Sequence, residues 1–281
     1  MMHLLNFKTY PPHVALRHLI KNVVVLESDY IKSSTHSDES IYFPTPDESI
    51  YIHINTRFLS RKMDQDSQRL CSNFVVVTPQ ITPKLLSFKE KHLAVGVHFH
   101  PGGLYQFLGI PITEIYDDGF DGEDLLGNEI REFIEKCHDK QSDFGYLNTT
   151  VQQFFLQRLY KMKERLPVDR ALSFLMTHHN ASIDQAASIA CLSPRQFERK
   201  CKERLGMTPK VYARLSRFFK AFHQIEANQN TPWTDIVYGL GYYDQMHFIK
   251  DFKDFTGHTP NGIKTKLEEI NVRFQLEWDK L

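Results

Sequence analysis

The spacing of apolar residues divides the chain into a first part with the period of β-strands and a second part with the period of helices. In the first hundred residues, two runs alternate apolar and polar positions and two are short runs rich in β-branched or apolar residues, and prolines and clusters of aspartate and serine separate them. This pattern predicts an antiparallel sheet or barrel with one buried face. The strands are expected at Asn22–Ile31, Ser49–Asn55, Phe74–Thr78 and His92–His100.

Helical spacing begins after Gly103. It predicts short helices over Leu104–Leu108 and Glu129–Cys137, and one long amphipathic helix over Tyr146–Leu166 that is ended by Pro167. The apolar stripe of this long helix has two interpretations, a dimer seam or a connector between two domains.

The helical part contains an internal repeat at an offset of 51 residues. The segment from Phe197 to Pro209 matches the segment from Phe248 to Pro260, and both copies close with the motif Gly-x-Thr-Pro. In each copy a short helix and a tight turn precede a second helix, which Ser193 or Asp244 caps at its start. Short helix, tight turn and second helix form a helix-turn-helix unit, so two such units are predicted.

The two turns of the repeat differ in sequence. The short first helices are expected at Ile183–Ile189 and Asp235–Leu240. The turn after the second of them contains Gly241, which suits a backbone with positive φ. At the offset of 51, Ala190 occupies the equivalent position in the first unit, so a less tight first turn is predicted.

The second helix of each unit carries an apolar stripe on one side and polar, mostly basic residues on the other. A solvated surface is the ordinary interpretation of one such helix, but two copies in this context fit recognition helices. In a recognition helix, arginine can read guanine, glutamine can read adenine and lysine can hold phosphate. The residues on this side are Arg195, Arg199 and Lys202 in the first copy, and Gln245, Met246, His247, Lys250 and Lys253 in the second.

Charge is distributed unevenly, although the chain of 281 residues has 34 Lys and Arg and 34 Asp and Glu. Residues 167–266 hold 14 basic and 9 acidic residues, whereas residues 1–166 hold 18 and 21. The zero net charge by itself predicts no partner. The modest basic excess coincides with the repeat.

The repeat carries a family resemblance. LSPRQFERKCKERLGMTPKVYARLSRF (Leu192–Phe218) and GYYDQMHFIKDFKDFTGHTP (Gly241–Pro260) resemble the DNA-binding domain of the AraC/XylS family of bacterial transcription regulators. The resemblance covers residues 168–266 and implies two helix-turn-helix units joined by a long helix, here Pro209–Ala227. By position, it implies base-facing roles for Arg195, Gln196 and Arg199, and for Gln245, Met246, His247 and Lys250. Glu198, among the exposed residues of the first unit, could repel phosphate or accept a hydrogen bond from cytosine.

The first part has a resemblance of its own. YPPHVALRHLIKNVVVLE (Tyr10–Glu27) and VGVHFHPGGLYQFLGIP (Val95–Pro111) resemble the N-terminal domain of one AraC subgroup, a distant relative of the cupin-like sensory barrel. This implies a regulatory or dimerising module and names no ligand. Together the resemblances predict a cytoplasmic bacterial regulator of double-stranded DNA that forms a homodimer, without cofactor or membrane association. A small-molecule effector and RNA polymerase are further candidate partners.

The predicted fold class is α+β. An N-terminal antiparallel β-barrel or sandwich-like domain with helices precedes an all-α domain of two helix-turn-helix units joined by a long helix. The expected division is a regulatory or dimerisation domain at 1–145, a connecting helix at 146–166, a DNA-binding domain at 167–266 and a tail at 267–281.

His98 and His100 suggest an alternative, a cupin-type metalloenzyme fused to a DNA-binding domain, with His53 and His92 as further ligands. Cupin sites usually add a glutamate shortly after such a pair and a third histidine, but here Pro-Gly-Gly follows and the next carboxylate is Glu114. Alternation also places both histidines on the strand face opposite its apolar residues. We therefore predict scaffold rather than a metal site, and no enzyme; if a pocket lies on that side, both would contact a ligand.

The four cysteines, Cys71, Cys137, Cys191 and Cys201, form no CxxC pair and match no zinc-finger spacing. They are predicted to be reduced thiols of a cytosolic protein. A DNA-repair methyltransferase can also carry an AraC-like domain, but it needs a zinc-binding cysteine cluster and a reactive cysteine, which this spacing does not provide. The start of the sequence lacks the features of a secretory signal, and no window approaches the ~18 apolar residues of a membrane span.

Overall fold

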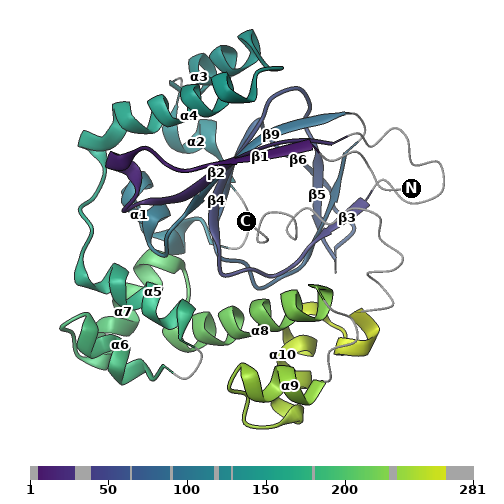
Figure 1. The fold of residues 1–281 in the computed structure, drawn as a ribbon, viewed down its shortest axis with the longest axis vertical. Coiled ribbons are helices and arrows are strands. Elements are labelled where there is room, and N and C mark those ends of the chain that lie inside the picture. Colours follow the sequence, from purple (N-terminus) through teal and green to yellow (C-terminus); the bar gives the residue numbers. More distant parts are fainter. Residues whose placement is uncertain are drawn as a thin grey trace.

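The computed structural model describes residues 6–28, 39–63, 65–88, 91–116, 120–127, 129–178, 181–227 and 233–263. Sheets and their helices form the β part, the described residues up to 166, and only helices form the helical part, those from 167 onward (Figure 1). The predicted α+β fold class is confirmed. The expected tail at 267–281 lies outside the described residues.

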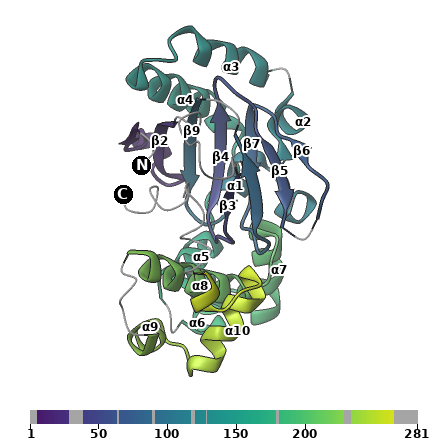
Figure 2. The ribbon, with the colours of Figure 1, turned by 90° about the vertical axis from the view of Figure 1, so that its right-hand side faces the viewer.

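Two antiparallel sheets build the β part (Figure 2). The six-stranded sheet has the order β1-β2-β9-β4-β7-β10, and the four-stranded sheet has the order β3-β8-β5-β6. The first consists of β1 (Asn6–Tyr10), β2 (Ile20–Ser28), β4 (Glu48–His53), β7 (Phe74–Val77), β9 (His92–Phe99) and β10 (Phe120–Asp121). The second consists of β3 (Glu39–Tyr42), β5 (Leu59–Lys62), β6 (Arg69–Leu70) and β8 (Lys84–Ser87). The four predicted strands correspond to β2, β4, β7 and β9.

The central strands of the six-stranded sheet are buried on both faces, whereas one buried face was predicted. On β9, Leu93 and Val95 pack under helices, while Ala94 lines the space between the two sheets. On β4, Ile52 packs under the helices and His53 lines the space between the two sheets. The prediction was wrong because the smaller sheet covers the face that a single sheet would leave to solvent.

Helices cover the other face of the six-stranded sheet. They are α1 (Gly103–Leu108), α2 (Gly122–Leu126), α3 (Glu129–Asp139) and α4 (Phe144–Arg158), with short 3-10 turns η1 (Val14–Leu16), η2 (Ile112–Glu114) and η3 (Leu159–Lys161). Phe155 of α4 is fully buried, with its ring centroid 5.8 Å from that of Phe99 on β9 and 4.7 Å from that of Phe107 on α1. The apolar stripe of α4 is therefore used within its own chain.

The long helix predicted over Tyr146–Leu166 is shorter than expected. It ends at Arg158, η3 follows, and Met162 is extended with φ −75° and ψ 150°. The backbone N–H of Lys163 donates to the carbonyl of Gln106 at 2.9 Å, so this segment is bonded to α1 instead of continuing a helix. Leu166 is also extended, as expected for a residue that precedes a proline.

Six helices form the described helical part. They are α5 (Pro167–Thr177), α6 (Ile183–Ile189), α7 (Pro194–Leu205), α8 (Pro209–Ala227), α9 (Trp233–Gly239) and α10 (Gln245–Thr256). The long helix α8 has the bounds that the family resemblance implied.

A buried ion pair lies where the two parts meet. The Nε of Arg204 on α7 donates to Oδ1 of Asp169 on α5 at 2.5 Å, and both side chains are almost fully buried. Oδ2 of Asp169 accepts the backbone N–H of Leu166 at 2.7 Å. The guanidinium of Arg204 lies over the ring of Tyr105 from α1, 4.7 Å from its centroid. One carboxylate thus joins the chain entering α5 to the second helix of the first helix-turn-helix unit.

The Pro-Gly-Gly turn after β9 packs against this ion pair. Gly102 has φ +82°, and a Cβ added there would lie 2.7 Å from Oδ1 of Asp169. The turn follows the end of β9 at Phe99, and it allows the β part to approach the carboxylate without a side chain between them.

Glu48 is a second buried carboxyl at this junction. Its Oε2 accepts the backbone N–H of Leu104 at 3.4 Å, and it is 1 % exposed. Burial is the main cause that raises the pKa of Glu48 well above its ordinary value, and the nearby charge of Asp169 raises it further.

We expect Gly102→Ala to destabilise the chain by more than the ~1–2 kcal/mol that a positive φ costs an L-residue. The additional loss of stability comes from the close contact between the new Cβ and Asp169, because this carboxylate cannot move without breaking its ion pair with Arg204. The matched control is Gly127→Ala, because Gly127 has φ +71° with no atom within 4 Å of an added Cβ. Urea unfolding would measure both variants; equal losses of stability would contradict the expected contact.

Glu48→Gln should reduce the pH dependence of stability. The raised pKa means that the folded chain keeps a proton that the unfolded chain releases near pH 4.5, so this contribution to the free energy of unfolding falls as pH rises. The slope from one group is at most about 1.4 kcal/mol per pH unit. Unfolding measured from pH 5 to pH 8 should show a shallower decline for Glu48→Gln, but not for the exposed control Glu114→Gln. Parallel curves for Glu48→Gln and the unsubstituted chain would contradict this assignment.

Candidate nucleic-acid interface

The first helix-turn-helix unit consists of α6, a turn and α7. Ser193 caps α7, because its Oγ accepts the backbone N–H of Gln196 at 3.3 Å, and the Oε1 of Gln196 accepts the N–H of Ser193 at 3.0 Å. This is a reciprocal capping box with Pro194 at the first helical position. The amide oxygen of Gln196 is therefore engaged in the cap, which its candidate role in base reading did not anticipate.

The two sides of α7 are as predicted. Phe197, Cys201 and Leu205 are fully buried, while Arg195, Arg199 and Lys202 are exposed, as is Gln196. Lys202 lies 2.9 Å from a carboxylate oxygen of Glu198, one turn before it. This contact partly neutralises the charge of Lys202 and also that of Glu198, the residue expected to oppose a phosphate.

The second unit consists of α9, a turn and α10. Asp244 caps α10 by accepting the backbone N–H of His247 at 2.8 Å, and its Oδ1 lies 2.9 Å from the Nδ1 of the same histidine. The buried stripe is Phe248, Phe252 and Phe255. The exposed residues are Gln245, Met246, His247, Lys250 and Lys253.

Tyr243 joins the exposed surface of the second unit and was not predicted. It is 86 % exposed and precedes the cap of α10, with its ring 5.8 Å from that of His247. The sequence signal for it is a tyrosine directly before the capping residue Asp244, in the turn of a predicted helix-turn-helix unit.

The turn residue that matches Gly241 of the second unit is Cys191 of the first unit, and not Ala190 as predicted. The residue with positive φ is Cys191 in the first unit, at +55°, and Gly241 in the second, at +69°. The N–H of Leu192 bonds to the carbonyl of Ala187, as that of Tyr242 bonds to the carbonyl of Val237. The equivalence of Ala190 with Gly241 was wrong, because the second turn has one more residue before its cap.

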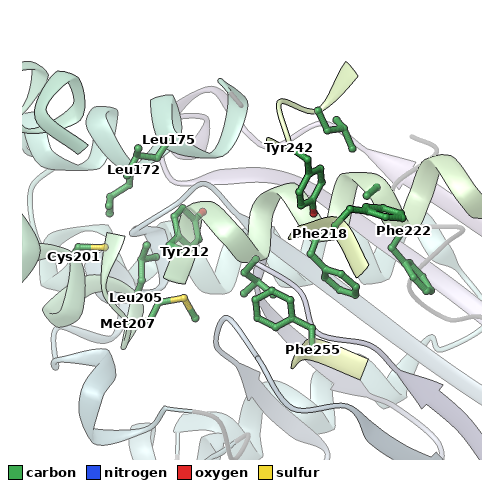
Figure 3. Close-up of a cluster of buried hydrophobic side chains, with 14 of the residues drawn as sticks. Leu172, Leu175, Cys201, Leu205, Met207, Tyr212, Phe218, Phe222, Tyr242 and Phe255 are labelled. Carbon is green, nitrogen blue, oxygen red and sulfur yellow. The ribbon is translucent and has the colours of Figure 1, made fainter. Parts of the chain in front are cut away.

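Helix α8 holds the second unit through charged contacts. Arg214 lies 2.7 Å from Asp251 and 2.6 Å from Asp254, both on α10. Arg217 donates to the carbonyl of Gly241 at 3.2 Å and lies over the ring of Tyr242. Figure 3 shows the apolar side of the same helix, where Tyr212, Phe218 and Phe222 point into the shared core.

The second helices of the two units, α7 and α10, have different neighbours. Helix α7 contacts η2 and α1 of the β part, whereas α9 and α10 lie on the side of α8 away from the sheets (Figures 1 and 2). Glu203 of α7 contacts the β part, because its carboxylate accepts a hydrogen bond from the hydroxyl of Tyr105 on α1 at 2.5 Å. The exposed basic residues of α7 are not covered by it.

A small cavity of about 80 Å³ lies between the two sheets. Two histidines that line it lie close together: the Nδ1 of His53 is 2.7 Å from the Nε2 of His92. Burial lowers the pKa of His53 to about 3. Burial, and next the neighbouring His53, also lower the pKa of His92 well below its ordinary value, so the cavity favours the neutral form of both imidazoles. The lining is mainly apolar and aromatic and includes Leu26, Tyr42, Tyr51, Phe58, Val75, Val77, Leu86 and Phe88.

The four histidines proposed as metal ligands, His53, His92, His98 and His100, do not form one site. His98 and His100 are not among the residues that line the cavity, and His98 packs edge-on against Tyr51 instead. Across the described residues, no three His, Cys, Asp or Glu side chains are placed to hold one metal ion. All four cysteines are free thiols. No described helix is both long and apolar enough to cross a membrane.

Comparison with known families finds two matches. Residues 186–266 match a family described as "Helix-turn-helix domain", and residues 8–121 match a "Domain of unknown function (DUF6597)". The HTH-type transcriptional activator RhaS of Yersinia pestis (strain Pestoides F) is 30% identical over 98 residues, 34% of this chain and 36% of that protein. RhaS of Escherichia coli (strain K12 / DH10B) is 23% identical over 175 residues, 58% of this chain and 63% of that protein. The chain thus spans less than two thirds of the length of these relatives.

Among solved structures, ToxT from Vibrio cholerae O395 is 12% identical, with a TM-score of 0.47 over 95% of this chain and 99% of that one. The C-terminal domain of AraT from Geobacillus stearothermophilus is 25% identical, with a TM-score of 0.33 over 37% and 88%. The family match identifies residues 186–266 as a helix-turn-helix domain.

We expect Cys191→Gly to stabilise the chain by up to about 1 kcal/mol. Glycine adopts a positive φ without the steric cost that cysteine bears there. We expect the removal of this cost to exceed the free energy lost because glycine has more conformational entropy in the unfolded chain. The control is the neighbouring Ala190→Gly, which should lose about 0.5–1 kcal/mol because Ala190 has φ −76°. Chemical unfolding of both variants is the measurement, and a loss of stability in Cys191→Gly would contradict the assigned turn.

Proposed function

We propose that the chain is a sequence-specific DNA-binding transcriptional regulator whose two recognition helices, α7 and α10, read successive segments of the major groove. The observation that carries this proposal is the pair of equivalent capped helices, each with a buried apolar stripe and an exposed polar face. The names of the similar proteins, transcriptional activators, support the same function. The sign of regulation is left open.

The chemistry of the exposed residues suggests different base preferences for the two helices. Arg195 and Arg199 on α7 can each donate two hydrogen bonds to guanine. On α10, Gln245 can bond to adenine and the apolar Met246 can contact the methyl group of thymine. Lys202 and Lys253 are proposed to hold phosphates, and His247 and Lys250 to contact bases.

The cavity between the sheets is the proposed effector site. Its mostly apolar and aromatic lining suits a mainly apolar ligand, and its volume of about 80 Å³ restricts that ligand to a small molecule. The Nε2 of His53 is buried and has no hydrogen-bond partner, so one polar group on the ligand would satisfy it.

Further partners are proposed at a coarser level. A homodimer would have to use a surface other than the apolar stripe of α4, since that stripe is buried against the chain's own sheet. Contact with RNA polymerase and action in the bacterial cytoplasm follow from the proposed function. The division at 1–145, 146–166 and 167–266 stays a prediction.

Selection of bound fragments from random DNA, at about 150 mM salt with the full chain, tests the proposal. A guanine-containing segment and an A·T-rich segment are expected in the selected sites. Equal binding of selected and scrambled fragments would overturn the proposal, because electrostatic binding alone is insensitive to sequence.

Arg199→Ala is expected to weaken binding to the selected site by about 1–3 kcal/mol and to relax the preference at one base pair. Lys136→Ala, which removes one positive charge from the β part at an exposed position of α3, is the matched control and should leave the preference intact. Competition binding with single-base variants of the site is the measurement. Uniform weakening on every sequence would instead make Arg199 a phosphate contact.

A further inference from the structure

Strands β3 and β8 form a wall shared by the cavity and the helical part. They pair in antiparallel register from Glu39 opposite Ser87 to Tyr42 opposite Lys84. Because successive side chains of a strand point to opposite faces, each strand presents one set of residues to each side. We call these two strands, with Phe43, the β3–β8 wall.

One side of the β3–β8 wall lines the cavity. Tyr42, Lys84 and Leu86 contribute to its lining, and Tyr42 packs in the same apolar cluster as Phe58 and Phe88. Tyr42 and Lys84 are both less than 10 % exposed. A ligand in the cavity would therefore contact the wall directly.

The other side of the wall belongs to the core of the helical part. Ile41 and Phe43 are buried in the cluster that contains the buried faces of α5, α7, α8 and α10, and Leu85 packs against that cluster. The ring of Phe43 lies 4.5 Å from that of Phe222 on α8. The β part thus supplies side chains to the hydrophobic core of the proposed DNA-binding unit.

Ring contacts continue from this point to the second recognition helix. Phe222 is 6.0 Å from Phe218, one turn earlier on α8, between ring centroids. Phe218 in turn lies 4.9 Å from Phe252 and 5.1 Å from Phe255 between ring centroids, both on the buried stripe of α10. Figure 3 shows Phe222, Phe218 and Phe255 of this series. The side of α10 opposite this stripe carries Met246 and Lys250.

Close packing makes such a series of contacts sensitive to small displacements. Buried side chains occupy defined rotamers with little free volume, so a shift of one strand is passed to whatever packs on its other side. The wall is only one strand layer thick between the cavity and Phe222.

We propose that occupancy of the cavity is transmitted to the second helix-turn-helix unit through the β3–β8 wall, by way of Phe43, Phe222 and Phe218. This inference rests on the proposed function for its effect on DNA, but the transmission itself does not require DNA. Phe43 is a positioning residue in this scheme, since it lies outside the cavity and does not reach the recognition surface.

An internal substitution can replace the unidentified ligand in a test. Ala94 lines the cavity, so Ala94→Leu places an isobutyl group inside it, and Ala94→Val is a smaller version for use if the first fails to fold. Hydrogen exchange of the full chain without DNA should show altered protection of amides in α8 and α10. Unchanged exchange there, in a variant that folds, would overturn the transmission whether or not the chain binds DNA.

A double-mutant cycle locates the route. We expect Ala94→Leu to change the Kd for the selected DNA site at least about fivefold, the lower end of usual coupling between sites. Combined with Phe43→Leu, which shortens the contact with Phe222, the change should fall to within about twofold. Phe155→Leu is the control background, because Phe155 is also buried but packs on the other side of the β part. An effect of Ala94→Leu that persists with Phe43→Leu would overturn the route, whereas loss of site preference in the unsubstituted chain would overturn the proposed function.

Discussion

The carboxylate of Asp169 is the point on which the arrangement of the two parts depends. It accepts hydrogen bonds from Arg204 and from the backbone of Leu166, and it lies against Gly102. A buried charge is tolerated only when it is paired, and removal of one partner of such a pair typically costs about 3–5 kcal/mol. The position of this one group therefore fixes how the connecting segment enters α5, where α7 lies and how closely the turn after β9 approaches both.

Local sequence patterns were sufficient for the helical part and much less so for its turns. The repeat and the caps at Ser193 and Asp244 gave α7 and α10, because capping and helical spacing are properties of neighbouring residues. The turns were misaligned because an ungapped repeat cannot show that one turn has an extra residue. The exposure of the predicted DNA-facing residues agrees with their proposed role, but their contacts with bases stay a prediction.

The cavity could not be predicted from local patterns. His53 and His92 are 39 residues apart, and they meet because β4 pairs with β9 while a second sheet covers that face. The alternation that predicts a strand does not show whether one or both of its faces are buried. For the same reason, the sequence did not reveal that Tyr42 and Phe43, adjacent in the chain, belong to two different hydrophobic cores.

The sharing of one core by both parts has a consequence for separating them. A fragment that starts at Pro167 would lose Ile41 and Phe43 from its core and Tyr105 from above Arg204. Apolar surface on α8 and a buried ion pair would then face water, which favours aggregation. The secondary structure changes at the boundary before α5, but the hydrophobic core continues across it, so we expect the two parts to unfold in one cooperative transition.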